Sequence, residues 1–558
     1  MPKPLRMVFW MVLFVSCVAP VFAQTVDTAW VRRFNGVMNS SDGGSAIAVG
    51  HAGHVYVAGY TTSSGTSEDY LTIKYKSNGD TAWVRNYNGT ANSWDRVSAI
   101  AIDNAGQAYV TGYSYGSGTL SDYVTIKYHL DGDTAWVRRY GLISYDFAGA
   151  IAVDDSDNVY VIGYSIGSGT GLDYATIKYY PNGDTAWVRR YNGPGNGEDW
   201  ARAMAVDSSG NIYVTGRSAG SGTDLDYATI KYEPNGDTAW VRRYNGPGNQ
   251  WDVATAIAVD GSGNVYVTGY SVGNGTSNDF ATIKYDSNGD TAWVRRYNGP
   301  NYQVDNANAI AVDGSGNVYV TGLSTDMGLA SYYVTIKYTS DGDTLWLRRY
   351  IGPGNNHDEA QALAMDGSGN VYVTGYSYGS GFSKDYATIK YDSNGDTAWV
   401  ARYDGPAIAT DSACAIAVDD SGNVYVTGSS IGAGTSTDCV TIKYVQSPSA
   451  VEDEAESTRK PSEFALSQNY PNPFNPSTAI KFKVQGSKFK VPIPTTLIIY
   501  NILGQKMRTL VDEDRSPGDY AVQWDGKDDQ GNQLASGVYF YQLKAGNYTS
   551  SRKMVLLK

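Results

Sequence analysis

Cysteine and histidine are both scarce in this chain, whose 558 residues include 3 Cys and 4 His. Cys17 belongs to the apolar N-terminal segment, so only Cys414 and Cys439 remain for a disulfide. A third strand-like run separates the strand-like runs that carry them, which puts their backbones about 10 Å apart at ~4.8 Å per strand. That distance is too long for an S–S bond. We therefore predict a fold without disulfides, no metal centre at His51 and His54, and a solvated turn in their place.

Positive charge and long apolar runs are also limited. The chain has 43 Lys+Arg against 56 Asp+Glu, a net charge of −13, which becomes −15 once Lys3 and Arg6 are removed. An acidic protein of this kind is not expected to bind nucleic acid. The long apolar run, 7–18, follows those two cations and precedes small residues near position 23. We predict a secretory signal peptide at 1–23, with a membrane anchor as the alternative, although the run is short for a span.

What the chain has in abundance is one repeated unit. The stretch 252–300 contains four strand-like runs, AIAV, NVYVTGY, FATIKY and DTAWVRRY, of which the first pair and the last pair are joined by tight Gly-containing turns. The Trp of the fourth run recurs every 53 residues, with one spacing of 51, at Trp30, Trp83, Trp136, Trp187, Trp240, Trp293, Trp346 and Trp399. Four strands per unit of about 50 residues indicate a β-propeller.

The order of the strands predicts how the ring closes. After the signal peptide the chain opens with a fourth-type strand at 27–34, whereas the last repeat ends at Tyr444 without one. The N-terminal strand is therefore expected to complete the eighth blade, because an open solenoid, the alternative, would leave an unpaired edge at each end. We predict an all-β chain with an eight-bladed propeller of four-stranded blades at 24–444, followed by a small Ig-like β-sandwich.

The unit resembles a known family. GNVYVTGYS at 263–271 is similar to the SBBP bacterial β-propeller repeats, and the resemblance covers about three quarters of the chain. That family is usually described as seven-bladed, whereas the strand types here each occur eight times.

The C-terminal part has a different composition. A charged linker at 445–464 precedes a segment at 465–558 that contains YPNPFNP, LGQ, WDG and LASGVYFY, with a basic end KMVLLK. Together these motifs resemble the C-terminal sorting domain of the type IX secretion system of Bacteroidetes-like bacteria. The resemblance implies Sec-dependent export, passage across the outer membrane with type IX secretion machinery as partner, removal of this domain, and release or anchoring at the cell surface.

Several recurrent residues invite a chemical interpretation. G-x-S-x-G occurs six times, but a nucleophile elbow needs a strand, a turn and a helix, so we predict no catalytic residue. Paired arginines such as Arg295 and Arg296 are expected to form a solvated outer rim. An Asp precedes the first strand of every unit, and we expect it to accept backbone or Thr hydrogen bonds, with cation binding as the alternative. No cofactor or metal is predicted, although Ca²⁺ at the Asp-rich turns stays open.

Long connections lie on one face of such a blade and tight turns on the other, so the long-loop face is the expected binding face. Three tryptophans beside the recurrent Asp are not part of the repeat pattern and are the candidate ligand contacts: Trp94, Trp200 and Trp251, with Asp95, Asp199 and Asp252. We expect a monomeric, secreted or surface-held, non-catalytic binding scaffold for a glycan or protein. The alternatives are a propeller enzyme acting on extracellular polysaccharide and a passive structural or adhesive envelope protein.

Overall fold

The computed structural model describes residues 26–446, except 119, 142–144, 168, 327–329, 380–382 and 408, and residues 465–556, except 467–468, 470–473, 475–476, 485–491, 517 and 547. The chain divides into two compact units, Met1–Ser449 and Ala450–Lys558. The predicted signal peptide at 1–23 and nearly all of the predicted linker at 445–464 lie outside the described residues. Within the described part, no helix combines the length and the apolar character that crossing a membrane requires.

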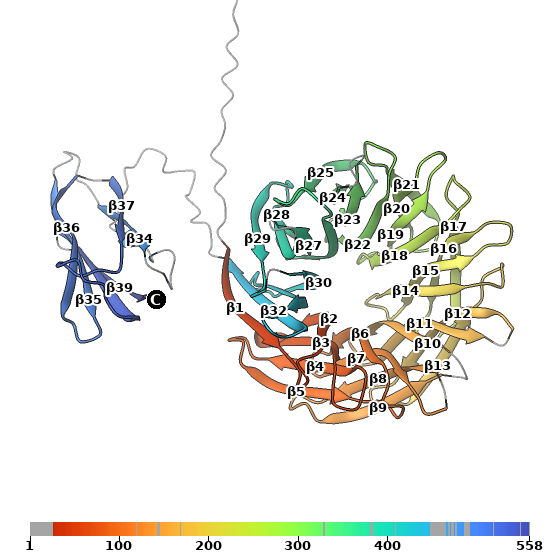
Figure 1. The fold of residues 1–558 in the computed structure, drawn as a ribbon. Coiled ribbons are helices and arrows are strands. Elements are labelled where there is room, and N and C mark those ends of the chain that lie inside the picture. Colours follow the sequence, from red (N-terminus) through yellow and green to blue (C-terminus); the bar gives the residue numbers. More distant parts are fainter. Residues whose placement is uncertain are drawn as a thin grey trace, which may run out of the picture. The chain divides into compact units, whose positions relative to one another are not determined.

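The first unit is a ring of eight antiparallel four-stranded sheets, or blades, arranged around a central opening (Figure 1). Its innermost strands are β2 (Asp42–Val49), β6 (Asp95–Ile102), β10 (Asp146–Val153), β14 (Asp199–Val206), β18 (Asp252–Val259), β22 (Asp305–Val312), β26 (Glu359–Met365) and β30 (Asp411–Val418). The second strands are β3 (Val55–Thr61), β7 (Ala108–Tyr115), β11 (Val159–Gly167), β15 (Ile212–Ala219), β19 (Val265–Val272), β23 (Val318–Thr325), β27 (Val371–Tyr378) and β31 (Val424–Ile431).

The third strands are β4 (Asp69–Tyr75), β8 (Ser121–Tyr128), β12 (Gly171–Tyr179), β16 (Leu225–Tyr232), β20 (Asn278–Tyr285), β24 (Ser331–Tyr338), β28 (Lys384–Tyr391) and β32 (Thr437–Gln446). The outermost strands are β5 (Thr81–Tyr87), β9 (Thr134–Tyr140), β13 (Thr185–Tyr191), β17 (Thr238–Tyr244), β21 (Thr291–Tyr297), β25 (Thr344–Tyr350), β29 (Thr397–Tyr403) and, from the N-terminus, β1 (Val26–Phe34). Blades 1 to 7 run from β2–β5 to β26–β29, and blade 8 consists of β30, β31, β32 and β1.

The hydrophobic cores lie between the blades. Tyr56 and Trp83 of blade 1, for example, pack with Val110 and Tyr128 of blade 2. Because each sheet packs both faces against its neighbours, the second and third strands are buried along nearly their whole length instead of on alternate residues. Each blade therefore depends on the next one for its core.

The N-terminal strand closes the ring. β1 pairs antiparallel with β32 from Val26 opposite Gln446 to Phe34 opposite Cys439. Trp30 of this strand joins a core with Val57 and Ile73 of blade 1. The predicted eight blades and their closure by 27–34 are thus confirmed. Cys414 and Cys439 are free thiols, as expected from their spacing.

The tight turns that join the first and second strands satisfy their polar groups with local hydrogen bonds. Asp260 Oδ1 accepts the backbone N–H groups of Ser262 and Asn264, both at 2.9 Å. Its Oδ2 accepts the side-chain N–H of Asn264 at 2.8 Å and the Tyr266 hydroxyl at 3.0 Å. Four hydrogen bonds leave this carboxylate little capacity for a Ca²⁺ ion, which needs six to eight oxygen ligands. Hairpin chemistry accounts for the recurrent DGSGN sequence.

The paired arginines are not a solvated rim, so that expectation was wrong. The Arg at the first of these two positions bonds to the turn between the third and fourth strands of the next blade, as Arg85 Nε does to the Gly132 carbonyl at 2.7 Å in blade 1, where Asn86 holds the second position. Its guanidinium also lies 5.8 Å from the ring centre of Trp83. The second Arg turns inward to a carboxylate, as Arg296 does to Asp279 at 2.7 Å. Both arginines make bonds within the ring because the outer strand borders the neighbouring blade as well as solvent.

One junction lacks the first of these bonds, and its sequence shows why. Blade 7 has Ala401 where the other outer strands have the turn-binding Arg. The next blade, blade 8, has no turn between its third and fourth strands, because its fourth strand comes from the N-terminus. Gln446 compensates in part, accepting a bond from Lys390 and donating to the Gly422 carbonyl, both at 2.5 Å. Ala401 therefore marks the seam of the ring.

The second unit is a two-layered β-sandwich. Its sheets are β33 (Ala465–Leu466), β34 (Thr478–Val484) and β37 (Gly518–Trp524), and β36 (Lys506–Arg515), β35 (Ile493–Asn501), β38 (Gly537–Ala545) and β39 (Tyr548–Leu556). They enclose a core around Trp524, Leu497 and Tyr541. This confirms the predicted small Ig-like sandwich. Most of YPNPFNP lies outside the described residues.

Candidate functional site

The strand register identifies the edge of the ring that carries the long loops. In blade 5, Asp252 at the start of the first strand lies opposite Ser271 at the end of the second, and Ser271 lies opposite Asp279 of the third. The same three positions meet in the other blades. The recurrent aspartates and the three candidate tryptophans therefore share one edge, which we call the long-loop edge. The opposite, tight-turn edge carries turns such as Asp260–Asn264.

The recurrent Asp anchors the incoming loop, as expected. Asp252 Oδ2 accepts the backbone N–H of Gly246 at 2.6 Å, and Gly36, Gly89, Gly193, Gly299, Gly352 and Gly405 make the equivalent bond in other blades. Asp95, Asp199 and Asp252 are all fully buried. Burial and, to a smaller extent, the nearby Asp226 carboxylate raise the pKa of Asp252 to about 6, although bonds from Gly246 and Ser271 oppose the shift.

A second Asp recurs near the start of the third strand of most blades, as Asp279 does in blade 5, and belongs to an ion pair between strands. Arg296 donates to Asp279 at 2.7 Å and to the Ser271 hydroxyl at 2.5 Å, and it also contacts the Tyr244 hydroxyl of the preceding blade at 3.0 Å. Equivalent Arg–Asp pairs join Arg33, Arg139, Arg190, Arg243 and Arg402 to Asp438, Asp122, Asp173, Asp226 and Asp385. These contacts tie neighbouring blades together, so the two aspartates have a structural task.

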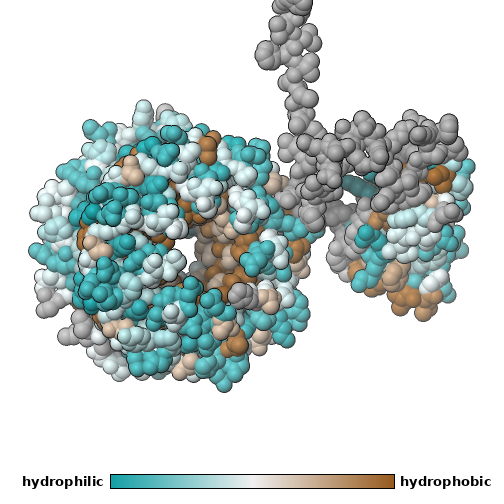
Figure 2. Space-filling view, turned by 180° about the vertical axis from the view of Figure 1, so that it is seen from behind, coloured by the Kyte–Doolittle hydropathy of each residue, from teal (hydrophilic) through white to brown (hydrophobic). Residues whose placement is uncertain are grey.

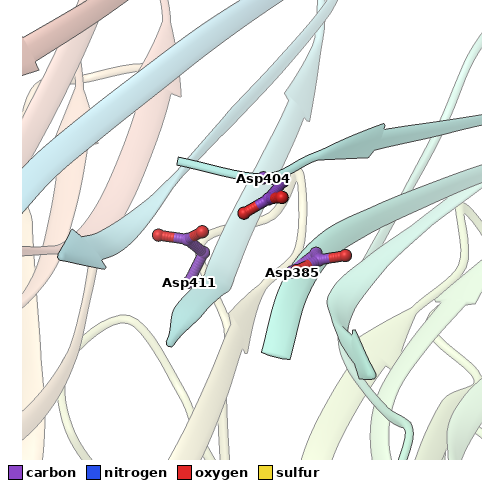
Figure 3. Close-up of side chains that lie close together, drawn as sticks. All are labelled: Asp385, Asp404 and Asp411. Carbon is purple, nitrogen blue, oxygen red and sulfur yellow. The ribbon is translucent and has the colours of Figure 1, made fainter. Parts of the chain in front are cut away.

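One junction gathers a third carboxylate. Asp385, Asp404 and Asp411 each offer an oxygen within 4.8 Å of the others, and Figure 3 shows them converging from separate segments of the long-loop edge. Asp404 occupies a position where most other repeats have Asn. Asp385 is already paired with Arg402 at 2.8 Å, and Asp411 accepts the Gly405 N–H at 2.6 Å. The set offers only three oxygens beside a guanidinium, which is a poor match to the coordination that Ca²⁺ requires.

Side chains that follow the recurrent Asp form a belt at the long-loop end of the ring. Each lies opposite a partner on the second strand, as Trp200 lies opposite Arg217. Each also packs against the preceding blade, as the Trp200 ring stacks on the Tyr164 ring with 4.6 Å between the ring centres. The stacked part, which we call the aromatic belt, consists of Tyr60, Arg96, Tyr113, Phe147, Tyr164, Trp200 and Arg217. It runs through blades 1 to 4. The equivalent positions in blade 8 hold Ser412 and Ser429.

The three candidate tryptophans differ in their surroundings. Trp94 is 47% exposed and Trp251 is 52% exposed, whereas the Trp of the repeat is between 5% and 9% exposed in every blade. Trp200 instead lies within the aromatic belt, between Tyr164 and the Arg217 guanidinium, whose carbon is 3.7 Å from the indole ring centre. Trp94 and Trp251 therefore present surface to a ligand, and Trp200 supports the blade junction. Ligand binding by any of the three remains a prediction.

The tight-turn edge is hollowed as well. A hollow of about 380 Å³ is lined by Asp207, Asp260 and Lys231 among others, and one of about 470 Å³ is lined by turns of blades 8, 1 and 2. Blade 8, which the N-terminal strand completes, therefore borders the second hollow. Figure 2 shows the central opening passing through the ring, with hydrophobic residues on its wall, as expected for strands of the AIAV type.

The sequence interpretation missed the aromatic belt, although a signal for it was present. The position after the recurrent Asp holds Gly43, Arg96, Phe147, Trp200, Val253, Asn306, Glu359 and Ser412 in the successive blades. Such variation within a uniform repeat marks a position that the blade itself does not constrain. Only the register, which brings these side chains beside those of the preceding blade, shows that they form one surface.

Comparison with known proteins agrees with this architecture. The model of the SBBP β-propeller repeat matches six segments, 135–169, 186–222, 239–280, 292–326, 347–383 and 404–434. The FlgD Ig-like domain model matches 478–549. The uncharacterized WD repeat-containing protein L264 of Acanthamoeba polyphaga mimivirus is 22% identical over 456 residues, which are 66% of this chain and 31% of that protein. The chain thus spans about a third of the length of this curated relative.

Solved structures show more distant likenesses. PorZ, an essential bacterial surface component of the type-IX secretion system of Porphyromonas gingivalis, aligns with a TM-score of 0.37 at 14% identity, over 92% of this chain and 75% of PorZ. The α-L-arabinofuranosidase Arb93A of Fusarium graminearum aligns with a TM-score of 0.32 at 8% identity, over 52% of this chain and 91% of that one. Scores this low carry no argument about function. The eight four-stranded blades and the six SBBP repeat matches show that the chain is a β-propeller repeat protein, and its C-terminal unit matches the FlgD Ig-like domain.

Proposed function

We propose that the ring is a non-catalytic binding scaffold that works outside the cell and contacts a glycan or protein ligand through its long-loop edge. The observation that carries the proposal is the exposure of Trp94 and Trp251, at 47% and 52%, on an edge where the repeat does not require them. An indole held in water costs hydrophobic free energy that a bound ligand recovers. Its flat face suits stacking on sugar rings or on apolar peptide side chains.

The export route is part of the same proposal. The sequence motifs of the second unit resemble a type IX sorting domain, and this unit is a compact sandwich that matches the FlgD Ig-like domain model. The type IX secretion machinery is accordingly the proposed partner of this unit. Two exposed side chains in the turn between β35 and β36, Ile502 at 70% and Leu503 at 76%, offer it an apolar contact.

Substitution of both exposed tryptophans tests the binding proposal. Full-length protein is screened on a glycan array and by pull-down, and each ligand found is titrated against the Trp94→Ala/Trp251→Ala variant. We expect binding to fall at least tenfold, since a buried aromatic contact contributes about 1.5–3 kcal/mol. Tm should change by no more than a few degrees.

Tyr180→Ala serves as the matched control, because Tyr180 is 51% exposed in a turn of the opposite edge. A ligand that binds the double variant as tightly as the wild type would contradict the proposed surface. Release of new sugar ends from a polysaccharide by the wild-type protein would favour the enzyme alternative instead.

Truncation after Ser449 tests the export proposal in the producing bacterium. This position is the boundary between the two compact units, so the ring should fold without the sandwich. We expect the truncated chain to accumulate inside the outer membrane, as measured by surface proteolysis and cell fractionation. Normal surface display of the truncated chain would contradict a sorting role for 450–558.

A further inference from the structure

A cation stands out on β14, the innermost strand of blade 4. The position three residues after the recurrent Asp bonds to the next blade in some repeats, as Thr255 does to the Ala307 carbonyl at 2.7 Å and Asn308 to the Ala360 carbonyl at 2.8 Å. In blade 4 this position is Arg202, which is exposed. Within the part of the chain that the structure describes, Arg202 makes neither of these bonds nor an ion pair.

Arg217 lies on β15, which pairs with the strand of Arg202, and its positive charge has few compensating partners. Its side chain is 13% exposed and packs on Trp200, and its buried Nε has no hydrogen-bond partner among the described residues. Its carboxylate contact is to Glu198 at 3.4 Å, and that carboxylate is 59% exposed. Burial lowers the pKa of Arg217, and the charge of Arg202 lowers it further. The two guanidiniums, whose positive charges repel each other, therefore have Glu198 as their one ion-pair partner among the described residues.

The repeat also places an exposed aromatic side chain at this junction. In blades 1 and 2 the equivalent positions are Tyr60, Trp94 and Arg96, and the Arg96 guanidinium lies 4.5 Å from the Tyr60 ring centre and 5.4 Å from that of Trp94. Three repeats later these positions are Arg217, Trp251 and Val253. Trp251 therefore borders the same junction as Arg217, without an arginine of its own blade across its ring.

We propose that Arg202, Arg217 and Trp251 form a subsite for the carboxylate and ring of an acidic sugar, a uronate unit of a polysaccharide chain. The inference rests on the proposed binding function and names its ligand class. A guanidinium matches a carboxylate with two parallel N–H···O bonds, and a second one nearby neutralises the charge when water is displaced. The exposed indole offers a flat apolar face to the sugar ring. A sulfated sugar presents the same charge, so the test includes it separately.

Titration calorimetry of the full-length protein tests this subsite. The probes are hexasaccharides of galacturonate and mannuronate, a hyaluronan hexasaccharide, their methyl esters as neutral counterparts, and a sulfated galactan fragment. We expect at least one of the uronate probes to bind, its methyl ester to bind about tenfold more weakly, and added salt to weaken the acid form only. Arg202→Gln should remove the preference for acid over ester. Arg202 is exposed, so this variant should fold.

Lys76→Gln is the matched control, because it removes one exposed positive charge from the tight-turn edge. It should leave both affinities unchanged. Arg217→Lys, which keeps the charge and loses the planar fork, should weaken the acid form by an intermediate factor.

Each other outcome has a defined meaning. If no uronate binds, if acid and ester bind equally, or if Arg202→Gln keeps the preference, the subsite is overturned. A preference for the sulfated fragment alone also overturns the carboxylate assignment. Should a neutral glycan or a protein bind through Trp94 and Trp251 independently of Arg202, the proposed function stands while this inference fails. If no ligand is found in any screen, both the proposed binding function and the uronate subsite are contradicted.

Discussion

The two edges of the ring hold their repeated aspartates in opposite electrostatic states. At the long-loop edge, burial raises the pKa of Asp252 and Asp305 to about 6, with help from a carboxylate of the preceding blade. At the tight-turn edge, Asp207 and Asp260 have pKa values below their ordinary value, because bonds from Asn, backbone N–H groups and a Tyr hydroxyl outweigh the desolvation that opposes them. Ionisation is thus favoured at Asp207 and Asp260 of the tight turns and disfavoured at Asp252 and Asp305, which begin their strands at the long-loop edge.

This difference supports the long-loop edge as the proposed binding face. The tight turns satisfy their carboxylates internally and are nearly the same in most blades, so they hold the ring together. The long-loop edge keeps incompletely compensated charges, exposed indoles and a belt whose composition changes from blade to blade. Repeated side chains whose polar groups are all hydrogen-bonded within the turn indicate a structural role. Side chains that differ from blade to blade, with exposed indoles and partly compensated charges, are typical of a binding surface.

Removal of β1 is the strongest way to break the ring, because both edges depend on its closure. Deleting residues 26–34 exposes the ladder of β32, removes Trp30 from its core and leaves Asp438 without Arg33. We expect Tm to fall by more than about 10 °C or the cooperative transition to be lost. Differential scanning calorimetry measures this. Val37→Ala, in an exposed loop, is the control and should be neutral, and an unchanged melt of the deletion variant would refute closure by β1.

The pH dependence of stability sharpens the comparison. Asp252 and Asp305 have folded pKa values of about 6 against an ordinary 3.8, so the folded state binds more protons than the unfolded state between these values. The free energy of unfolding should therefore fall as pH rises from about 4 to 6, with a slope of up to about 1.4 kcal/mol per pH unit from each carboxyl group. Asp260, with its lowered pKa, contributes stability above 3.8 that is lost as pH falls through its folded pKa.

Matched substitutions separate the two edges. Asp252→Asn removes the repulsion with Asp226 and should flatten the profile between pH 4 and 6, with little loss at pH 7. Asp260→Asn should cost about 1–2 kcal/mol at pH 7, since one amide oxygen replaces two carboxylate oxygens that accept four bonds. Urea unfolding followed by fluorescence at several pH values measures both. If the unfolding free energies of the two variants depended on pH in the same way, the opposite pKa shifts of Asp252 and Asp260 would be contradicted.

The smallest expected effect concerns the outer contacts between blades. Arg348→Ala removes the bond to the Gly395 carbonyl at 2.6 Å and should cost about 1 kcal/mol, because the side chain is partly exposed. Ala401→Arg restores the repeat sequence in blade 7 but should add no stability, since blade 8 lacks the turn that would accept the bond. A stabilisation of the Ala401→Arg variant similar in size to the Arg348→Ala loss would contradict this view of the seam.

Most of the ring was predictable because its information is local and repeated. Strand runs, turn residues and the phase of the fourth strand specified eight blades and their closure, and the Asp of each long-loop entry was correctly expected to accept hydrogen bonds. The arginine pairs were misjudged, since a charged outer strand is usually solvated and nothing in a single repeat shows that a neighbour's turn lies within reach. Among the candidate tryptophans, sequence alone did not separate the exposed Trp94 and Trp251 from the stacked Trp200.

By itself, the sequence determined the architecture: a period of 53 residues, four strands per unit and an N-terminal strand without a repeat of its own admit few arrangements. Tertiary structure alone decided which side chains meet across blades. Residues far apart in the chain, such as Tyr164 and Trp200 or Arg85 and Gly132, become neighbours only when two sheets pack face to face. Burial and hydrogen bonding set the pKa of Asp252, and burial leaves the charge of Arg217 only partly compensated by Glu198. Both are properties of the junction between blades, which no single repeat encodes.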